Sequence, residues 1–170
     1  DFLLNIAIPV DGIVAHNRHP VDVFLGCVQH VQSSAERSSD WPMLVAHLNY
    51  IQDQHIQLLA DLKINVAYCP RASAYFGHPH NRYPPHQYRE MLDAGVNVAL
   101  GTDSIICLDT TDRISVLDDM RYLYRRDGAA PQQLLAMGTI NGAVALGIDP
   151  ARVTLEPGEV AGLLAVPCDS

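Results

Sequence analysis

Two residues that could do acid–base or metal chemistry each stand where a short apolar run ends. His47 falls within residues 43–49, and Asp103 follows residues 96–101. Neither is specific alone, because a histidine at a strand end is often structural and aspartate is a common turn residue. At one edge of a parallel sheet, however, an imidazole and a carboxylate can share a divalent metal or a metal-bound water. The pair is therefore a candidate catalytic site.

The alternation of apolar runs and helical patterns predicts the scaffold that would hold this pair. Buried strands are predicted at residues 43–49, 64–70 and 96–101, and helices at 50–63, 86–95, 113–127 and 131–147. Residues 21–34 fit a connecting helix or a strand equally well. The order indicates parallel β/α units, in an open doubly wound sheet or in part of a (β/α)8 barrel. Both folds bind ligands at the carboxyl ends of the strands.

A long segment separates the second and third predicted strands. Residues 71–87 are rich in proline, histidine and aromatic residues, which indicates a loop of the kind that often carries function. Aromatic residues and a guanidinium at the carboxyl ends of the strands would suit a planar, polar substrate. The candidate substrate contacts are Arg71, Ser73 and His78 from this loop and Ser104 beside Asp103, although Ser104 could equally cap its turn.

Three histidines of the same region raise the question of a second metal site. His78, His80 and His86 lie within nine residues of one another. Their surroundings are rich in proline and asparagine and contain no second cluster of ligands. This context favours a surface loop over a metal site.

Composition narrows the class of partner. The 170 residues carry a formal net charge of -8, with 48% hydrophobic and 18% charged residues, which is enough for one sizeable core. Eleven lysines and arginines do not supply the basic surface that nucleic acids or anionic membranes require, so a small molecule is the expected partner. Four scattered cysteines without a CxxC pair favour a reducing, cytoplasmic setting.

The order of the motifs resembles that of a known family. Residues 44–78, 88–104, 134–148 and 154–167 are similar to the C-terminal half of the amidohydrolase superfamily, in its cytosine deaminase, guanine deaminase and chlorohydrolase-like branch. The resemblance implies an α/β fold, a partial (β/α)8 barrel of about strands five to eight, and a C-terminal return strand. It places the strand-five region and a linker in residues 1–42, the half barrel in 43–148 and the return strand in 149–170.

The resemblance also implies a chemistry. His47 corresponds to the strand-six histidine that contacts the metal-bound hydroxide or the substrate, and Asp103 to the strand-eight aspartate that binds the metal and handles the proton of the attacking water. His16 is the candidate strand-five metal ligand. Zinc is the first choice of metal, with iron, manganese and nickel as alternatives. The implied reaction is hydrolytic deamination or dechlorination of a small heterocyclic compound.

One part of the family's metal site has no counterpart. The family pattern begins with an HxH pair, and residues 1–46 contain none. The sequence therefore predicts a fragment that is inactive alone and can form a homo-oligomer, because half a barrel leaves two sheet edges unpaired. One alternative is a non-catalytic, amidohydrolase-derived interaction module without metal. Another is a phosphate-handling enzyme on an open sheet, but no strand end supplies the glycine-rich turn that it needs.

Overall fold

The computed structural model describes residues 18–33, 42–79, 84–108, 113–155, 157–160, 162 and 165. The chain divides into two compact units, residues 1–35 and 36–170. In the first unit, α2 spans Pro20–Ser33, so the ambiguity at residues 21–34 resolves to a helix. Pro20 provides a preset φ at the start of this helix, and Asp22 places a negative charge in its first turn.

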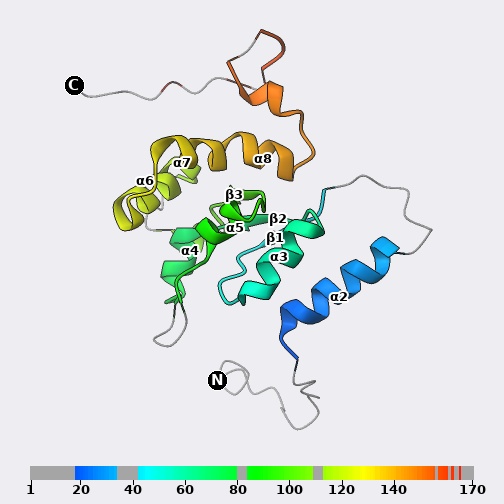
Figure 1. Cartoon of the computed structure of the whole chain (residues 1–170). Coiled ribbons are helices and arrows are strands. Elements are labelled where there is room, and N and C mark those ends of the chain that lie inside the picture. Colours follow the sequence, from blue (N-terminus) through cyan, green and yellow to red (C-terminus); the bar gives the residue numbers. More distant parts are fainter. Residues whose placement is uncertain are drawn as a thin grey trace. The chain divides into compact units, whose positions relative to one another are not determined.

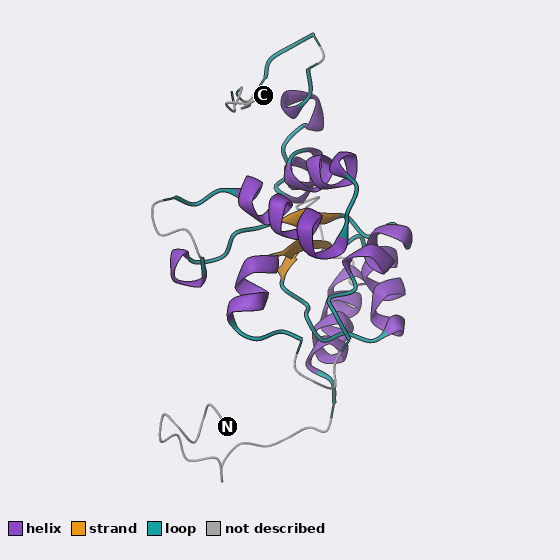
Figure 2. Cartoon of the chain, turned by 90° about the vertical axis from the view of Figure 1, so that its left-hand side faces the viewer, coloured by secondary structure: helices purple, strands orange, loops and turns teal. Residues whose placement is uncertain are grey.

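The second unit is built on a parallel sheet of three strands. They are β1 (Leu44–Ala46), β2 (Asn65–Tyr68) and β3 (Val98–Leu100), paired in the order β1-β2-β3. The register places Val45 beside Val66 and Val66 beside Val98. Figure 2 shows the strands as a small central sheet with helices around it. The α/β class and the parallel arrangement that the sequence predicts are confirmed.

Helices follow each strand and cover the sheet (Figure 1). The α-helices of this unit are α3 (Asp53–Asp61), α4 (Pro70–Tyr75), α5 (Tyr88–Asp93), α6 (Val116–Asp127), α7 (Pro131–Gly138) and α8 (Ile140–Ala145), and the 3-10 helices are η1 (Ile105–Cys107) and η2 (Pro150–Val153). Helices α5, α6, α7 and α8 all contact β3. Large apolar side chains from strands and helices, among them Leu59, Val66 and Met137, form a fully buried core. None of the helices among the described residues has the length and apolar run that crossing a bilayer requires.

Helix α6 shows how local sequence fixes an element. The Ser115 hydroxyl caps its N-terminus by accepting a hydrogen bond from the Leu117 amide, and Asp118 and Asp119 lie in the first turn. Gly128 ends the helix in the left-handed region at φ 62°, where glycine carries no steric cost. These signals explain why the predicted helix at residues 113–127 forms over Val116–Asp127.

Three predicted elements differ in the structure. The expected loop at residues 71–87 begins with α4, because Pro70 is preset for the first position of a helix. The single helix expected at 131–147 is two helices, because the backbone of Thr139 is not helical. The described residues of the return strand at 154–167 are not in a strand, since the three described strands pair only with one another. The rest of that segment lies outside the described residues.

Asparagine side chains tie the amino ends of the strands together. The Asn65 amide donates to the Met43 carbonyl, and the Asn97 amide donates to both the Asn65 side-chain oxygen and the Asn141 carbonyl, at 2.7–2.9 Å. Asn141 of α8 donates in turn to the Val98 carbonyl at 2.8 Å. This network links all three strands to a helix at the edge opposite the carboxyl ends.

The close approach of Gly101 to β2 yields a test of this packing. A Cβ at residue 101 would lie 2.9 Å from the Cys69 sulfur, so Gly101→Ala should destabilise the fold by about 1–3 kcal/mol in urea unfolding. The combined Gly101→Ala/Cys69→Ala variant should recover part of this loss. Gly142→Ala, in α8 with open space around it, should be neutral or should stabilise by up to about 1 kcal/mol. If Gly101→Ala costs as much in a Cys69→Ala background as in the wild type, the packing argument is wrong.

Candidate active site

The structure brings His47 and Asp103 together. Each follows a strand at its carboxyl end, His47 directly after β1 and Asp103 three residues after β3. The His47 amide donates to the Ala67 carbonyl at 2.8 Å, which extends the β1-β2 ladder into the site. His47 Nε2 lies 3.7 Å from Asp103 Oδ2, and the two side chains are 43% and 29% exposed. The pair is therefore preformed and open to a ligand.

Both residues adopt a backbone conformation that is unusual for side chains other than glycine. The φ angles are 68° at His47, 54° at Leu48 and 60° at Asp103. A left-handed conformation at a residue other than glycine costs on the order of 1–3 kcal/mol and persists only where the surroundings impose it. Such strain gathers at functional sites, because it aims a side chain in a direction that a relaxed strand end does not offer.

The Asp103 carboxylate is held in one orientation. Its Oδ1 accepts a hydrogen bond from the Ser104 amide at 2.8 Å, while Oδ2 faces His47. The Ser104 hydroxyl accepts from the Ile106 amide and so caps η1. The two oxygens therefore have separate roles, one anchored to backbone and one directed at the histidine.

His86 supports the strained backbone at His47 and is a residue that the sequence did not assign to the site. Its Nε2 lies 2.6 Å from the His47 carbonyl oxygen, and its ring stacks on Tyr68 with centroids 3.7 Å apart. The expectation of a surface loop is wrong for His86, which is buried. Its stacking partner is about 18 residues away in sequence, so no local pattern signals this burial.

Burial fixes the protonation state of His86. Desolvation lowers its pKa to about 4, despite the backbone hydrogen bond to His47 that favours the charged form. Because the His47 carbonyl is an acceptor, the neutral ring carries its proton on Nε2, which leaves Nδ1 as an acceptor. Nδ1 is buried and has no hydrogen-bond partner among the described residues.

Two other candidate substrate contacts, Ser73 in α4 and His78 after it, are hydrogen-bonded to the segment that follows β1. Ser73 Oγ donates to Asn49 Oδ1 at 2.8 Å, and His78 Nδ1 is hydrogen-bonded to the Tyr50 hydroxyl. Asn49, Ser73 and His78 line a hollow of about 400 Å³ together with His86. The structure thus places Ser73 and His78 at the hollow that His86 shares.

Arg71 occupies a different environment. Its guanidinium pairs with Asp119 of α6 at 3.0 Å, and its amide donates to the same carboxylate at 3.3 Å. The two side chains are 5% and 0% exposed. Desolvation raises the pKa of the Asp119 carboxyl above its ordinary value, while the Arg71 guanidinium opposes this shift. The pair ties the first turn of α4 to α6.

The donor set at the strand ends suits a divalent metal in type but not in number. An imidazole and a carboxylate are ligands that zinc accepts, and a zinc site in an enzyme uses three protein ligands. The described residues contain no group of three or more histidine, cysteine, aspartate or glutamate side chains arranged to hold a metal ion. His16 lies outside the described residues. Burial raises the pKa of the Cys69 thiol, which lies next to this site, to about 12.

Comparison with known proteins identifies the family. The model of the Amidohydrolase family matches residues 11–169. This chain belongs to the amidohydrolase family. A 5-methylthioadenosine/S-adenosylhomocysteine deaminase from Moorella thermoacetica is 35% identical over 132 residues, which are 75% of this chain and 30% of that protein. An S-triazine hydrolase from Gordonia rubripertincta is 28% identical over 73% of this chain and 26% of its own length.

Solved structures of amidohydrolases share the fold of this chain. An atrazine chlorohydrolase from Arthrobacter aurescens, crystallised with zinc, matches with a TM-score of 0.56 and 26% identity over 69% of this chain and 26% of that one. A further amidohydrolase matches with a TM-score of 0.52 and 25% identity. The amidohydrolase chain described here spans less than a third of the length of each of these relatives. The structural match to these two amidohydrolases supports the expectation that the chain is part of a (β/α)8 barrel.

The buried neutral state of His86 predicts a pH-dependent stability. Because its pKa is lower in the folded chain than the ordinary 6.5, the unfolded state binds the proton more tightly and stability falls as pH drops from about 6.5 to about 4. The loss should approach about 3 kcal/mol in urea unfolding. His86→Gln keeps a donor for the His47 carbonyl but does not titrate. If it shows the same loss over this range as the wild type, His86 is not the titrating group.

The role of Arg71 can be separated from that of surface arginines. Asp119→Asn leaves a buried guanidinium without its counter-charge and should destabilise the fold by about 3–5 kcal/mol. Asp118→Asn is the matched control, because Asp118 pairs with two arginines that are about half exposed, and it should cost no more than about 1 kcal/mol. Equal costs in urea unfolding would show that the Arg71 pair does not anchor α4.

Proposed function

We propose that this chain carries the strand-six to strand-eight portion of the active site of a metal-dependent amidohydrolase. The reaction is hydrolytic deamination, or dechlorination, of a small heterocyclic compound. The observation that carries the proposal is the His47–Asp103 pair, held at 3.7 Å by two strained strand ends. In this assignment β1, β2 and β3 are strands six, seven and eight of the barrel, residues 1–42 hold the strand-five region and residues 149–170 lead into a return strand.

Asp103 acts as the base and then as the acid. Its Oδ2 accepts the proton of the attacking water and returns it to the leaving amine, as general acid–base catalysis requires. Because Oδ1 is anchored by the Ser104 amide, the carboxylate keeps its direction through both transfers. His47 Nε2, which lies 3.7 Å from Oδ2, contacts the oxygen that the attacking water adds to the ring carbon. The loss of chloride needs no proton, so dechlorination uses the first transfer alone.

A divalent metal is the cofactor that fits this pair, with zinc as the first choice. Asp103 would bind it, and His16 would supply a second ligand. When bound, such a cation lowers the pKa of water toward neutrality. The Arthrobacter aurescens chlorohydrolase, whose crystal structure is a complex with zinc, supports this choice, and iron, manganese and nickel accept similar ligands.

The substrate is proposed to be a planar, polar heterocycle. The relatives are named for deamination of methylthioadenosine and S-adenosylhomocysteine and for hydrolysis of triazines. Ser73, His78 and Ser104 remain the proposed contacts, since all three lie in the segments that follow β2 and β3 at their carboxyl ends. We assign Arg71 to holding α4, because its guanidinium is committed to buried Asp119.

We further propose that this chain needs complementary barrel strands for activity. The support is its span of less than a third of the relatives' length and the two metal-type donors at the described strand ends. A chimera in which residues 36–170 replace the matching part of the Moorella thermoacetica deaminase supplies those strands. Metal content by elemental analysis and ammonia release from methylthioadenosine are the readouts.

Asp103→Asn should lower turnover of this chimera by at least about 100-fold, because the amide neither accepts the proton nor returns it. Arg152→Gln, a charge removal in η2, is the control and should leave turnover unchanged. The same pair of variants is assayed in the 170-residue chain, where neither metal nor ammonia release is expected. An active chimera that is indifferent to Asp103→Asn would refute the assigned mechanism, and a folded chimera without metal would favour a non-catalytic module.

A further inference from the structure

The backbone of His47 is held at both of its polar groups. Its amide donates to the Ala67 carbonyl at 2.8 Å, and its carbonyl oxygen lies 2.6 Å from His86 Nε2. The φ angles are 68° at His47 and 54° at Leu48, and such left-handed angles persist only where neighbouring groups impose them. The His47 carbonyl belongs to the peptide that joins these two residues. The bond from His86 therefore fixes the peptide at the centre of the strained segment.

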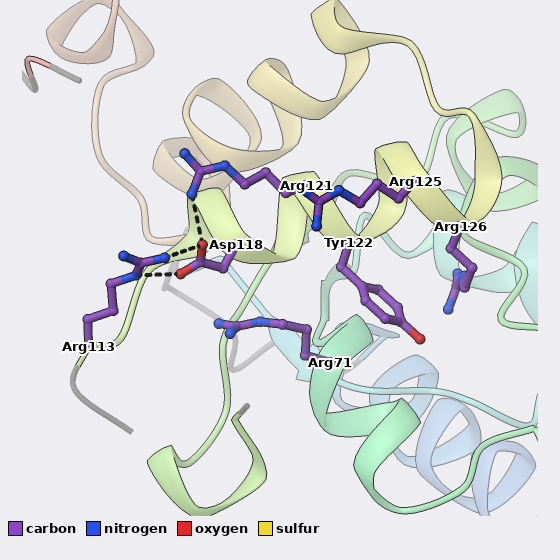
Figure 3. A pocket seen from close by; sticks show the side chains of 7 residues that line it. All are labelled: Arg71, Arg113, Asp118, Arg121, Tyr122, Arg125 and Arg126. Atoms are coloured by element: carbon purple, nitrogen blue, oxygen red, sulfur yellow. Dashed lines mark hydrogen bonds and ion pairs between the residues drawn. The ribbon is translucent and has the colours of Figure 1, made fainter. Parts of the chain in front are cut away.

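The His86 ring is itself fixed by contacts that lead to α6. It stacks on the buried Tyr68 ring, with centroids 3.7 Å apart and an angle of 15° between the ring planes. The Tyr68 hydroxyl accepts a hydrogen bond from Arg126 Nη2 at 3.2 Å. Figure 3 shows Arg126 extending from α6 on the same side of that helix as Tyr122. These contacts connect α6, through two stacked rings, to the His47 peptide.

A histidine at residue 86 is costly for the fold. Burial lowers its pKa to about 4, and its Nδ1 is buried without a hydrogen-bond partner among the described residues. Stacking on Tyr68 needs only a flat ring, which phenylalanine supplies without a desolvated nitrogen. Among the contacts of His86 with described residues, the one that requires an imidazole is the bond from Nε2 to the His47 carbonyl. This bond explains the choice of histidine better than stacking does.

We propose that His86 is a positioning residue for the reaction assigned to His47 and Asp103, an inference that rests on the proposed function. By donating to the His47 carbonyl, His86 holds the peptide in the orientation that directs the His47 imidazole toward Asp103, with Nε2 and Oδ2 3.7 Å apart. Without this donor the peptide can turn toward ordinary negative φ, and the imidazole moves with it. A displacement of about 1 Å can lower turnover by about 100-fold.

A purely structural role for His86 makes a different prediction. Loss of a buried contact would then lower the stability of the fold but would leave the His47–Asp103 contact unchanged in the molecules that remain folded. The two roles therefore differ in what happens to the pair, and this difference is measurable in the full chain without any turnover.

NMR spectra of the 170-residue chain at pH 7 test the contact directly. Asp103→Asn removes the charge beside the His47 ring and should shift the ring signals, which are assigned by their loss in His47→Gln. His86→Gln places an amide donor near the position of Nε2 and should keep this response. His86→Asn is one methylene shorter and does not reach the His47 carbonyl, and His86→Phe stacks without a donor, so both should reduce the shift by at least about half. An undiminished shift in both variants would overturn the proposal.

Turnover of the chimera with the Moorella thermoacetica deaminase provides the second readout. His86→Asn and His86→Phe should lower kcat by about tenfold or more with KM within about threefold, because the reacting pair is misplaced while the substrate contacts remain. His86→Gln should keep kcat within about threefold of the unsubstituted chimera. Tyr88→Phe is the matched control and should leave kcat within about twofold. It removes the hydrogen bond from the buried Tyr88 to Asp127 Oδ2 without touching the His47 peptide.

The two readouts separate this proposal from the function on which it rests. If Asp103→Asn leaves turnover of the chimera intact, the assigned mechanism fails, and the NMR comparison still decides whether His86 holds His47. If turnover depends on Asp103 but is equal in His86→Gln, His86→Asn and His86→Phe, His86 is not a positioning residue. The glutamine and asparagine variants differ by one methylene and are both polar, so their comparison stands even where His86→Phe alters the circular dichroism spectrum.

Discussion

Parallel pairing of β1, β2 and β3 is the constraint on which the rest of the unit depends. Neighbouring strands lie about 4.8 Å apart, so β1 and β3 are separated by roughly 10 Å across β2. The side chains of His47 and Asp103 nonetheless meet at 3.7 Å. They do so because both backbones turn through positive φ after their strands, and because Gly101 lets β3 approach Cys69. The short sheet and the strained residues at its strand ends therefore act together to bring the His47 and Asp103 side chains into contact distance.

The sequence was sufficient for the sheet and for the pair at its edge, because both depend on local patterns. An apolar run of the right length predicts a strand, and the rule that parallel strands present ligands at their carboxyl ends brings His47 and Asp103 together. What escaped the sequence depends on distant contacts. His86 is buried by stacking on Tyr68, and α4 is anchored by Asp119, which lies 48 residues beyond Arg71. No spacing rule relates such residues.

The net charge of the chain does not reveal where its arginines gather in the fold. Eleven basic residues in a chain of net charge -8 argue correctly against a surface that is basic overall. The fold nevertheless brings five arginines to one hollow, three of them by helical spacing along α6 and two from the segments that pack beside it. Helical periodicity at residues 121, 125 and 126 was visible in the sequence, whereas the arrival of Arg71 from α4 required the tertiary structure.

The asparagine network lies at the amino ends of the strands, so the residues that hold the sheet together are separate from those of the candidate site. Asn65, Asn97 and Asn141 hold the strands together at one edge of the sheet, while the proposed catalytic pair lies at the other. Substitutions in the loops after the strands can therefore accumulate without disrupting the pairing of the strands. Over evolutionary time, such a scaffold can change its substrate while the residues that determine its fold stay the same. This fits a family whose members are named for nucleosides and for triazines.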